Sequence, residues 1–225
     1  SMKKIPLFIV GLMALPAISH GQTIQQFLEK STVTGNIRSY YYNQMFGGDA
    51  VENRYAYSLG GMIKVQTAPL YGVSAGVAFY TANDLGANDT SGDQKRLDPL
   101  LMGSRTSLNV LGQAYLQYQN PWLKVDVGNL LLNTPWMGPA DAFMIPNTYQ
   151  AVTATLHPLP DLSIIAIREF RYINRIQADY HRQTLLNYNA HYSYLPDNSD
   201  GTLAFGIKGQ KLGIKAAAWF YRFYD

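Results

Sequence analysis

The 225-residue sequence contains no cysteine. Disulfide scaffolds, thiolate nucleophiles and cysteine-based zinc sites are therefore excluded. Charged residues make up only 15% of the chain, against about 25% in an average soluble domain. No run of about 18 apolar residues occurs beyond residue 22, so a helical membrane protein is excluded as well. What the chain has instead is 47% hydrophobic residues and 17 tyrosines, which excludes disorder.

The first residues read as a secretory signal peptide. Lys3 and Lys4 precede an apolar stretch from Ile5 to Ile18, which ends in small residues and is too short for a spanning helix. We expect a signal peptide over residues 1–21, cleaved after Gly21 or, as an alternative, after Ser19. The other interpretation is a buried helix of the mature domain. Without the two lysines, residues 22–225 carry 16 basic against 15 acidic side chains, and the lack of a basic stripe argues against a nucleic-acid partner.

The rest of the chain alternates apolar and polar residues with a period of two, which indicates strands. In residues 107–119 one predicted face holds Leu108, Val110, Ala114, Leu116 and Tyr118, and the other holds Ser107, Asn109, Gln113, Gln117 and Gln119. Similar patterns recur in residues 32–43, 57–66, 72–80, 122–129, 149–156, 162–172, 203–207 and 214–224. The sequence therefore predicts an all-β fold of about nine strands.

The connections between these strands alternate in length. Short turns are expected around Pro69, Pro121, Pro158 and Gln210, and long links over residues 47–55, 84–105, 131–148 and 173–201. Short turns on one rim and long loops on the other are typical of a transmembrane antiparallel β-barrel. Aromatic clusters at strand ends, such as Tyr40–Tyr42 and Trp219–Tyr224, resemble interface girdles. A secreted β-sandwich or surface adhesin stays open as an alternative, since hydropathy alternation alone does not separate the two.

Two passages resemble the OprD-type porins, the outer-membrane carboxylate channels of Gram-negative bacteria. The first is F-L-E-K-S-T-V-T-G-N-I-R-S-Y-Y-Y-N-Q-M-F at residues 27–46. The second combines L-K-V-D-V-G-N-L-L-L-N-T-P at 123–135 with D-A-F-M-I-P-N-T-Y-Q-A-V at 141–152. Asp141, Ile145, Pro146, Thr148 and Tyr149 match the family pattern, Phe143 replaces its arginine, and its glycine is not obvious near Ala151. The order and spacing of these motifs extend the resemblance from residue 27 to about residue 172.

The resemblance implies a monomeric 18-stranded barrel in outer-membrane lipid, which passes small solutes that commonly carry carboxylates. It also implies an infolded third loop, here Leu131 to Thr148, and the constriction candidates are Trp136, Asp141, Phe143 and Pro146. The alternative is a loop that only covers the mouth of the barrel. An odd number of strands would leave the barrel open. We therefore expect residues 22–225 to be the first half of a larger barrel.

A porin needs a graded field and a constriction, and neither a metal nor another cofactor. By strand parity the charged pore-lining candidates are Arg38, Lys64, Lys124, Asp126, Glu169, Arg171 and Lys208. Basic residues facing acidic ones would orient a carboxylate, which arginine can bind with two hydrogen bonds. Each residue taken singly could equally be a solvated charge without a role in selectivity. The basic ladder of the family comes largely from later strands.

An outer-membrane enzyme is the third interpretation. It would have to use His157, His181 or His191 with a carboxylate such as Asp161 or Asp179. No H-E-x-x-H zinc motif, Walker loop or dinucleotide fingerprint occurs. Scattered histidines are more often polar loop residues than ligands or bases, so the sequence predicts that the protein is not an enzyme.

Overall fold

The computed structural model describes residues 29–48, 52–89, 96–184 and 199–224. These residues form one antiparallel sheet whose strands follow each other in chain order. The strands are β1 (Thr32–Gln44), β2 (Arg54–Gln66), β3 (Val73–Asn83), β4 (Ser107–Gln119), β5 (Leu123–Leu130), β6 (Thr148–Leu159), β7 (Leu162–Ile173), β8 (Gly201–Lys211) and β9 (Ile214–Tyr224). The predicted all-β fold of about nine strands is confirmed. The predicted signal peptide lies outside the described residues.

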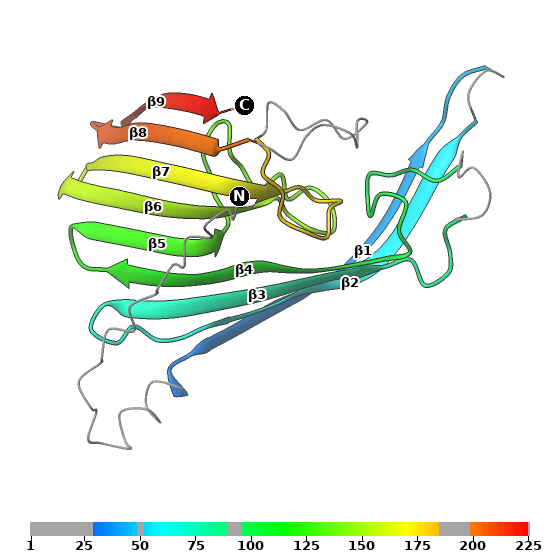
Figure 1. Ribbon diagram of the computed structural model, residues 1–225, viewed down its shortest axis with the longest axis horizontal. Helices are drawn as coiled ribbons and strands as arrows, with labels where there is room; N and C mark the ends of the chain where they lie inside the picture. Colours follow the sequence, from blue (N-terminus) through cyan, green and yellow to red (C-terminus); the bar gives the residue numbers. More distant parts are fainter. Residues whose placement is uncertain (1–28, 49–51, 90–95, 185–198, 225) are drawn as a thin grey trace, which may run out of the picture.

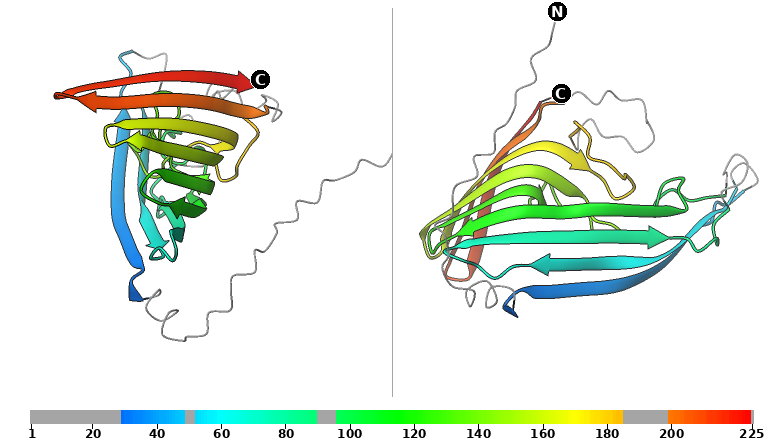
Figure 2. Two further views of the ribbon diagram at one scale, coloured as in Figure 1. Left: turned by 90° about the vertical axis from the view of Figure 1, so that its left-hand side faces the viewer. Right: turned by 60° about the horizontal axis from the view of Figure 1, so that its bottom comes forward.

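The sheet is a continuous meander that curls along its length (Figures 1 and 2). A β-sandwich packs two sheets face to face, whereas these nine strands belong to a single sheet. The sandwich alternative is therefore wrong for the described chain. Among the described residues, no helix has the length and apolar character needed to cross a membrane.

Short and long connections lie at opposite ends of the strands, as predicted. Figure 1 shows the hairpin turns on its left side; we call this end the short-turn rim. Connections 45–53, 84–106, 131–147 and 174–200 are at the other end, the long-loop rim. Two turns differ from the prediction: they lie at residues 160–161 and 212–213 instead of at Pro158 and Gln210. Leu212 and Gly213 have φ values of 51° and 81°. Positive φ values at both residues are required in a two-residue hairpin turn whose twist matches that of the strands.

The two faces of the sheet differ in chemistry. On the face that we call outer, large apolar side chains are exposed: Val77 is 48%, Phe79 43% and Leu116 61% exposed. On the opposite, inner face, Ala56, Ala78 and Tyr80 are buried and form part of a core with loop residues. The large apolar side chains of the strands therefore point away from the loops and are exposed. In a water-soluble sheet protein the apolar face is instead buried.

A bulge in β4 corrects the predicted parity of that strand. Ala78 pairs with Gln113 but Phe79 pairs with Leu111, so Gly112 is an extra residue. A bulge of this kind changes which face the following residues occupy. Leu108 and Val110 are consequently buried on the inner face rather than lying on the face of Leu116. A Cβ atom at Gly112 would lie 2.7 Å from the ring of Tyr80, which explains glycine here.

The core lies between the inner face and loops from the long-loop rim. Leu101 and Met102 of connection 84–106, and Met144 and Ile145 of connection 131–147, pack with Tyr80 in one buried cluster. A second cluster joins Leu132 and Met137 to inner-face residues of β6 to β8. Loops, rather than a second sheet, therefore bury the inner face at this end.

Candidate functional site

Residues 131–147, which we call the inner loop, contact both edge strands of the sheet. One contact is with β1 and the other with β9, the first and last strands in the sheet order. Pro135, Pro139 and Pro146 remove backbone donors, so the segment is a poor strand. Its own turns are closed instead by Thr134, whose backbone N–H donates to the Met137 carbonyl at 3.0 Å.

The contact with β1 combines an ion pair with aromatic packing. Arg38 Nη2 donates to Asp141 Oδ2 at 2.9 Å, and Arg38 Nη1 donates to Asp141 Oδ1 and to the Phe143 carbonyl oxygen. The Phe143 ring lies edge-on to Tyr40, with centroids 5.4 Å apart. Arg175, which belongs to connection 174–200, stacks over the Phe143 ring, and its Cζ atom lies 4.5 Å from the ring centroid. Phe143 therefore lies between β1 and a second loop.

The contact with β9 is aromatic. The Trp136 ring lies 6.2 Å from Tyr221 and 6.4 Å from Phe223, measured between centroids. Trp219, Tyr221 and Phe223 form a stacked column on the inner face of β9. Such ring pairs contribute about 0.5–1.5 kcal/mol beyond their buried area. An interface girdle faces lipid, so the interpretation of Trp219–Tyr224 as a girdle is wrong for the three residues of this column. It is also wrong for Tyr40, which packs on Phe143 of the inner loop.

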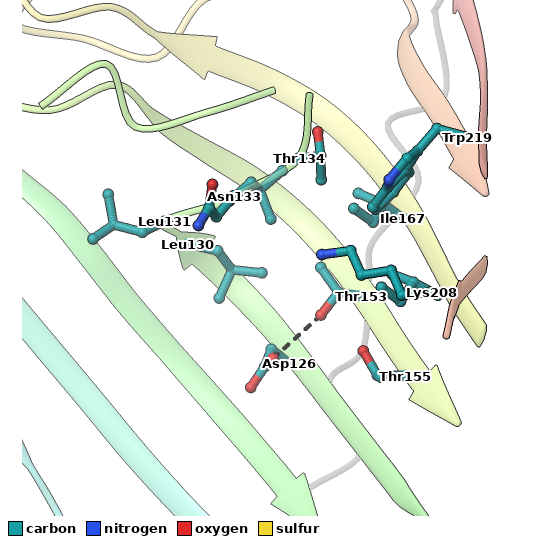
Figure 3. Close-up of a pocket in the computed structure, with 12 residues that line it drawn as sticks. Asp126, Leu130, Leu131, Asn133, Thr134, Thr153, Thr155, Ile167, Lys208 and Trp219 are labelled. Atoms are coloured by element: carbon teal, nitrogen blue, oxygen red, sulfur yellow. Dashed lines mark hydrogen bonds between the residues drawn. The ribbon is translucent and has the colours of Figure 1, made fainter. Parts of the chain in front are cut away.

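A cavity of about 150 Å³ lies where the inner loop leaves β5. Figure 3 shows Asp126, Thr153 and Lys208 pointing toward it from three strands. The Thr153 hydroxyl donates to Asp126 Oδ2 at 3.2 Å, and Lys124 Nζ lies 3.3 Å from the same oxygen. Lys208 Nζ lies 5.3 Å from the centroid of the Trp219 ring. A cation, an anion, a hydroxyl and an aromatic ring therefore line this cavity.

Strand pairing places six of the seven charged candidates on the inner face. These are Arg38, Lys64, Lys124, Asp126, Glu169 and Lys208. The structure brings Lys124, Asp126 and Lys208 together at or beside the cavity. Lys64 lies apart, where its Nζ donates to Gln113 Oε1 at 3.1 Å. Glu169 is 1% exposed and does not line the cavity, and Arg38 is bound to the inner loop.

Arg171 was predicted to line the pore, and the structure corrects this. A second register shift leaves Phe170 unpaired, because Ala151 pairs with Glu169 while Gln150 pairs with Arg171. Arg171 therefore lies with Arg168 and Phe170 around one depression of the outer face. Single-residue alternation does not predict such a shift, since one extra residue reverses the parity.

The sequence analysis missed Thr153 and Trp219 as lining residues of the cavity. Both occupy the inward parity of their strands, opposite Asp126 and Gly206 respectively. Parity was therefore a usable signal for them. The predicted constriction residues Trp136, Asp141 and Phe143 make the loop contacts described above, and Pro146 is buried in the same loop.

The histidines of the enzyme interpretation do not come together among the described residues. His157 Nδ1 lies 3.0 Å from Ser163 Oγ near the short-turn rim. The backbone of His181 pairs with Tyr172 near the opposite rim, and His191 lies outside the described residues. Within the described ranges, no group of three or more histidine or acidic side chains could hold a metal ion.

One catalytic pattern escaped the sequence analysis. Residues 72–76 read G-V-S-A-G, which matches the nucleophile elbow of many hydrolases. That elbow places serine on a turn between a strand and a helix, with its hydroxyl accessible. Ser74 instead lies inside β3, is 4% exposed, and is followed by another strand. The match therefore carries no catalytic geometry.

No protein-family model matches the chain, and no curated protein matches it either. Solved structures of outer-membrane porins do. Acinetobacter baumannii OccAB3 aligns with a TM-score of 0.72 at 16% identity, over 88% of this chain and 50% of that one. Pseudomonas aeruginosa OpdK aligns with a TM-score of 0.65 at 17% identity, over 86% and 48%. A BenF-like porin from Pseudomonas fluorescens Pf-5 gives 0.69 at 14%, over 87% and 50%.

The chain spans about half the length of these solved structures. At such identities the likeness concerns the fold. The resemblance to OprD-type porins in the sequence is confirmed at that level, and the chain has the fold of about half of an outer-membrane porin barrel.

Proposed function

We propose that this chain forms part of the wall of a Gram-negative outer-membrane porin, through which small hydrophilic solutes diffuse. The observation that carries this proposal is the inner loop, which is tied to β1 through Asp141 and to β9 through Trp136. A loop held between the two edges of a curled sheet would narrow the space that the sheet encloses. A constriction of this kind is how a wide barrel becomes selective.

The outer face supports a membrane location. Its exposed apolar residues include Ile63, Val77, Leu116, Val152 and Phe205. Large apolar side chains exposed on five strands of one face are costly in water and suit contact with lipid. The short turns would then lie in the periplasm and the long loops outside the cell, and the barrel would be a monomer like the family that it resembles.

The inner face supports a preference for solutes that carry a carboxylate. Lys64, Lys124 and Lys208 present ammonium groups from three strands, while Asp126 lies beside Lys124. A carboxylate that approaches the cavity would meet the ammonium group of Lys208, and Asp126, which accepts from the Thr153 hydroxyl, would repel it. One of the similar solved structures is that of Pseudomonas aeruginosa OpdK with vanillate, which is an aromatic carboxylate. Amino acids and organic acids are the solute class that we propose here.

Planar-bilayer recording of the full-length protein tests the proposal. We expect discrete conductance steps, and a shift of the KCl reversal potential toward cation preference in Lys208→Glu. Lys211→Glu is the matched control, since Lys211 ends the same strand and is exposed on the outer face. A protein that gives no conductance steps, or that stays monomeric in buffer without detergent, would overturn the porin assignment. An unchanged reversal potential in Lys208→Glu would mean that Lys208 does not contribute to ion selectivity, and the porin assignment would stand.

A further inference from the structure

A cluster of arginines lies on the outer face, where the strands meet the long-loop rim. The residues that line a depression of about 560 Å³ include Arg168, Arg171, Arg182, Asp200, Leu203 and Tyr224. Three of these residues are cationic and one is anionic. Charged residues on the lipid-facing side of a barrel are costly at the middle of the bilayer and tolerated near its interfaces. This surplus of positive charge therefore requires an explanation.

Among the residues that the structure describes, internal contacts neutralise part of this charge. Arg182 Nη2 pairs with Asp200 Oδ1 at 2.6 Å. Arg168 donates to the backbone carbonyl of Asp200 at 2.6 Å and stacks over the rings of Phe170 and Tyr224, and these partners carry no formal charge. Arg171 is exposed. The rings hold the Arg168 guanidinium plane in place, so its orientation is fixed before any ligand arrives.

The cluster continues into an apolar surface along β8. Leu203 lines the depression, and Phe205 and Ile207, two and four residues further along the strand, are 47% and 53% exposed. Strand alternation places all three side chains on the outer face. A ligand that fits this surface therefore has an anionic group at the rim and hydrocarbon that runs from there along the barrel wall.

We propose that this arginine cluster, formed by Arg168, Arg171 and Arg182, binds a phosphate group of a phosphorylated glycolipid in the outer leaflet. Arginine forks match phosphate oxygens with paired hydrogen bonds, and basic pockets at membrane interfaces bind phosphorylated head groups. The acyl chains would lie against Leu203, Phe205 and Ile207. The inference rests on the membrane location proposed above, and it goes beyond the channel because the cluster lies on the face opposite the pore.

Native mass spectrometry of the full-length protein in detergent micelles tests this site, with bisphosphorylated lipid A and its dephosphorylated form as probes. We expect at least a tenfold preference for the phosphorylated form. Arg171→Gln should reduce that preference by about fivefold, which is the change in affinity expected for the loss of one basic residue near a membrane surface. Lys211→Gln, which removes an outer-face cation at the short-turn rim, should leave it unchanged. Arg168→Gln is a weaker test, because Arg168 also binds two backbone carbonyls.

Equal binding of the two lipids by the unmodified protein would overturn the proposal. So would an Arg171→Gln variant that keeps the preference of the unmodified protein, or a Lys211→Gln variant that loses as much preference as Arg171→Gln. Inorganic phosphate is the remaining probe. If it alone displaces the glycolipid completely at millimolar concentration, the site is a general anion site and the lipid assignment is wrong. Bilayer conductance separates this proposal from the channel, since Arg171→Gln should conduct like the unmodified protein. If the unmodified protein conducts but binds both lipids equally, the lipid site is wrong and the channel assignment is unaffected.

Discussion

The guanidinium group of Arg38 in β1 donates to both carboxylate oxygens of Asp141, a residue 103 positions later in the inner loop. Two-ended contacts of this kind fix orientation as well as distance. Together with the Phe143 carbonyl, which accepts from the same guanidinium group at 2.9 Å, they fix one end of the loop against the first strand.

Releasing this end should widen the pore. In Asp141→Asn the ion pair is lost, and because the two side chains are 23% and 39% exposed, we expect only about 1 kcal/mol of lost loop stabilisation. Single-channel conductance of the full-length protein should rise and fluctuate more. Glu52→Gln is the control, since Glu52 pairs with Arg96 at 4.0 Å in an exposed position. Conductance identical to that of the unmodified protein in Asp141→Asn would argue against a constriction by this loop.

The other end of the loop can be tested by a double-mutant cycle. Trp136→Ala and Tyr221→Leu should show a coupling free energy of about 0.5 kcal/mol, the lower end for an aromatic pair, because Trp136 is 55% exposed. Denaturant titration in detergent micelles measures it. Trp122 is 57% exposed at a hairpin turn, so Trp122→Ala combined with Tyr221→Leu should be additive. Additivity of the Trp136 pair would mean that this contact does not hold the loop.

Neighbouring residues of β4 distinguish a membrane barrel from a water-soluble sheet. Leu116 is on the outer face and Gln117 on the inner face. Leu116→Lys should lower the free energy of unfolding in lipid vesicles by about 2 kcal/mol, as expected for a cation facing lipid. Gln117→Lys should change it little. A water-soluble protein would tolerate Leu116→Lys, since this side chain is already 61% exposed.

Tyr180 predicts a stability change at high pH. Its hydroxyl bonds Thr148 Oγ1 at 2.6 Å and donates to the Gly112 carbonyl at 2.9 Å, so it ties the connection after β7 to β4 and β6. Burial raises the pKa of Tyr180 from 10.0 to about 12. The unfolded chain therefore loses this proton first, and the stability that Tyr180 contributes is present below pH 10 and declines between pH 10 and 12.

Comparison with Tyr180→Phe isolates this effect. The variant should be less stable at neutral pH by about 1–2 kcal/mol, the cost of unpaired buried partners. The difference between the two proteins should shrink above pH 10. Chemical unfolding in micelles from pH 7 to 12 measures both quantities. Tyr118→Phe is the control, because Tyr118 is 40% exposed on the outer face. A difference that is constant with pH would contradict the assigned role.

Local alternation was enough to predict the strands and their connections. Residues 107–119 became β4 with the same bounds, and β1 ends one residue beyond its predicted limit. The long connections also lie within two residues of their predicted ends. These features depend on side-chain parity and turn residues that are close in the sequence, so the sequence contains them directly.

Bulges interrupt the alternation of side chains in β4 and β7. Gly112 and Phe170 each add one residue to a strand. The first moves Leu108 and Val110 to the inner face, and the second moves Arg171 to the outer face. Alternation predicts a side-chain direction only while the register is unbroken.

By itself, the sequence determined the all-β architecture, the nine strands and the inward parity of Lys64, Lys124, Asp126 and Lys208, because each follows from neighbours within one strand. Only the tertiary structure decided that Asp141 binds Arg38, that Trp136 packs on β9, and that three arginines gather on the outer face. The physical reason is sequence separation. These contacts join residues from distant segments, and they exist only once strand register and sheet curvature have brought those segments together.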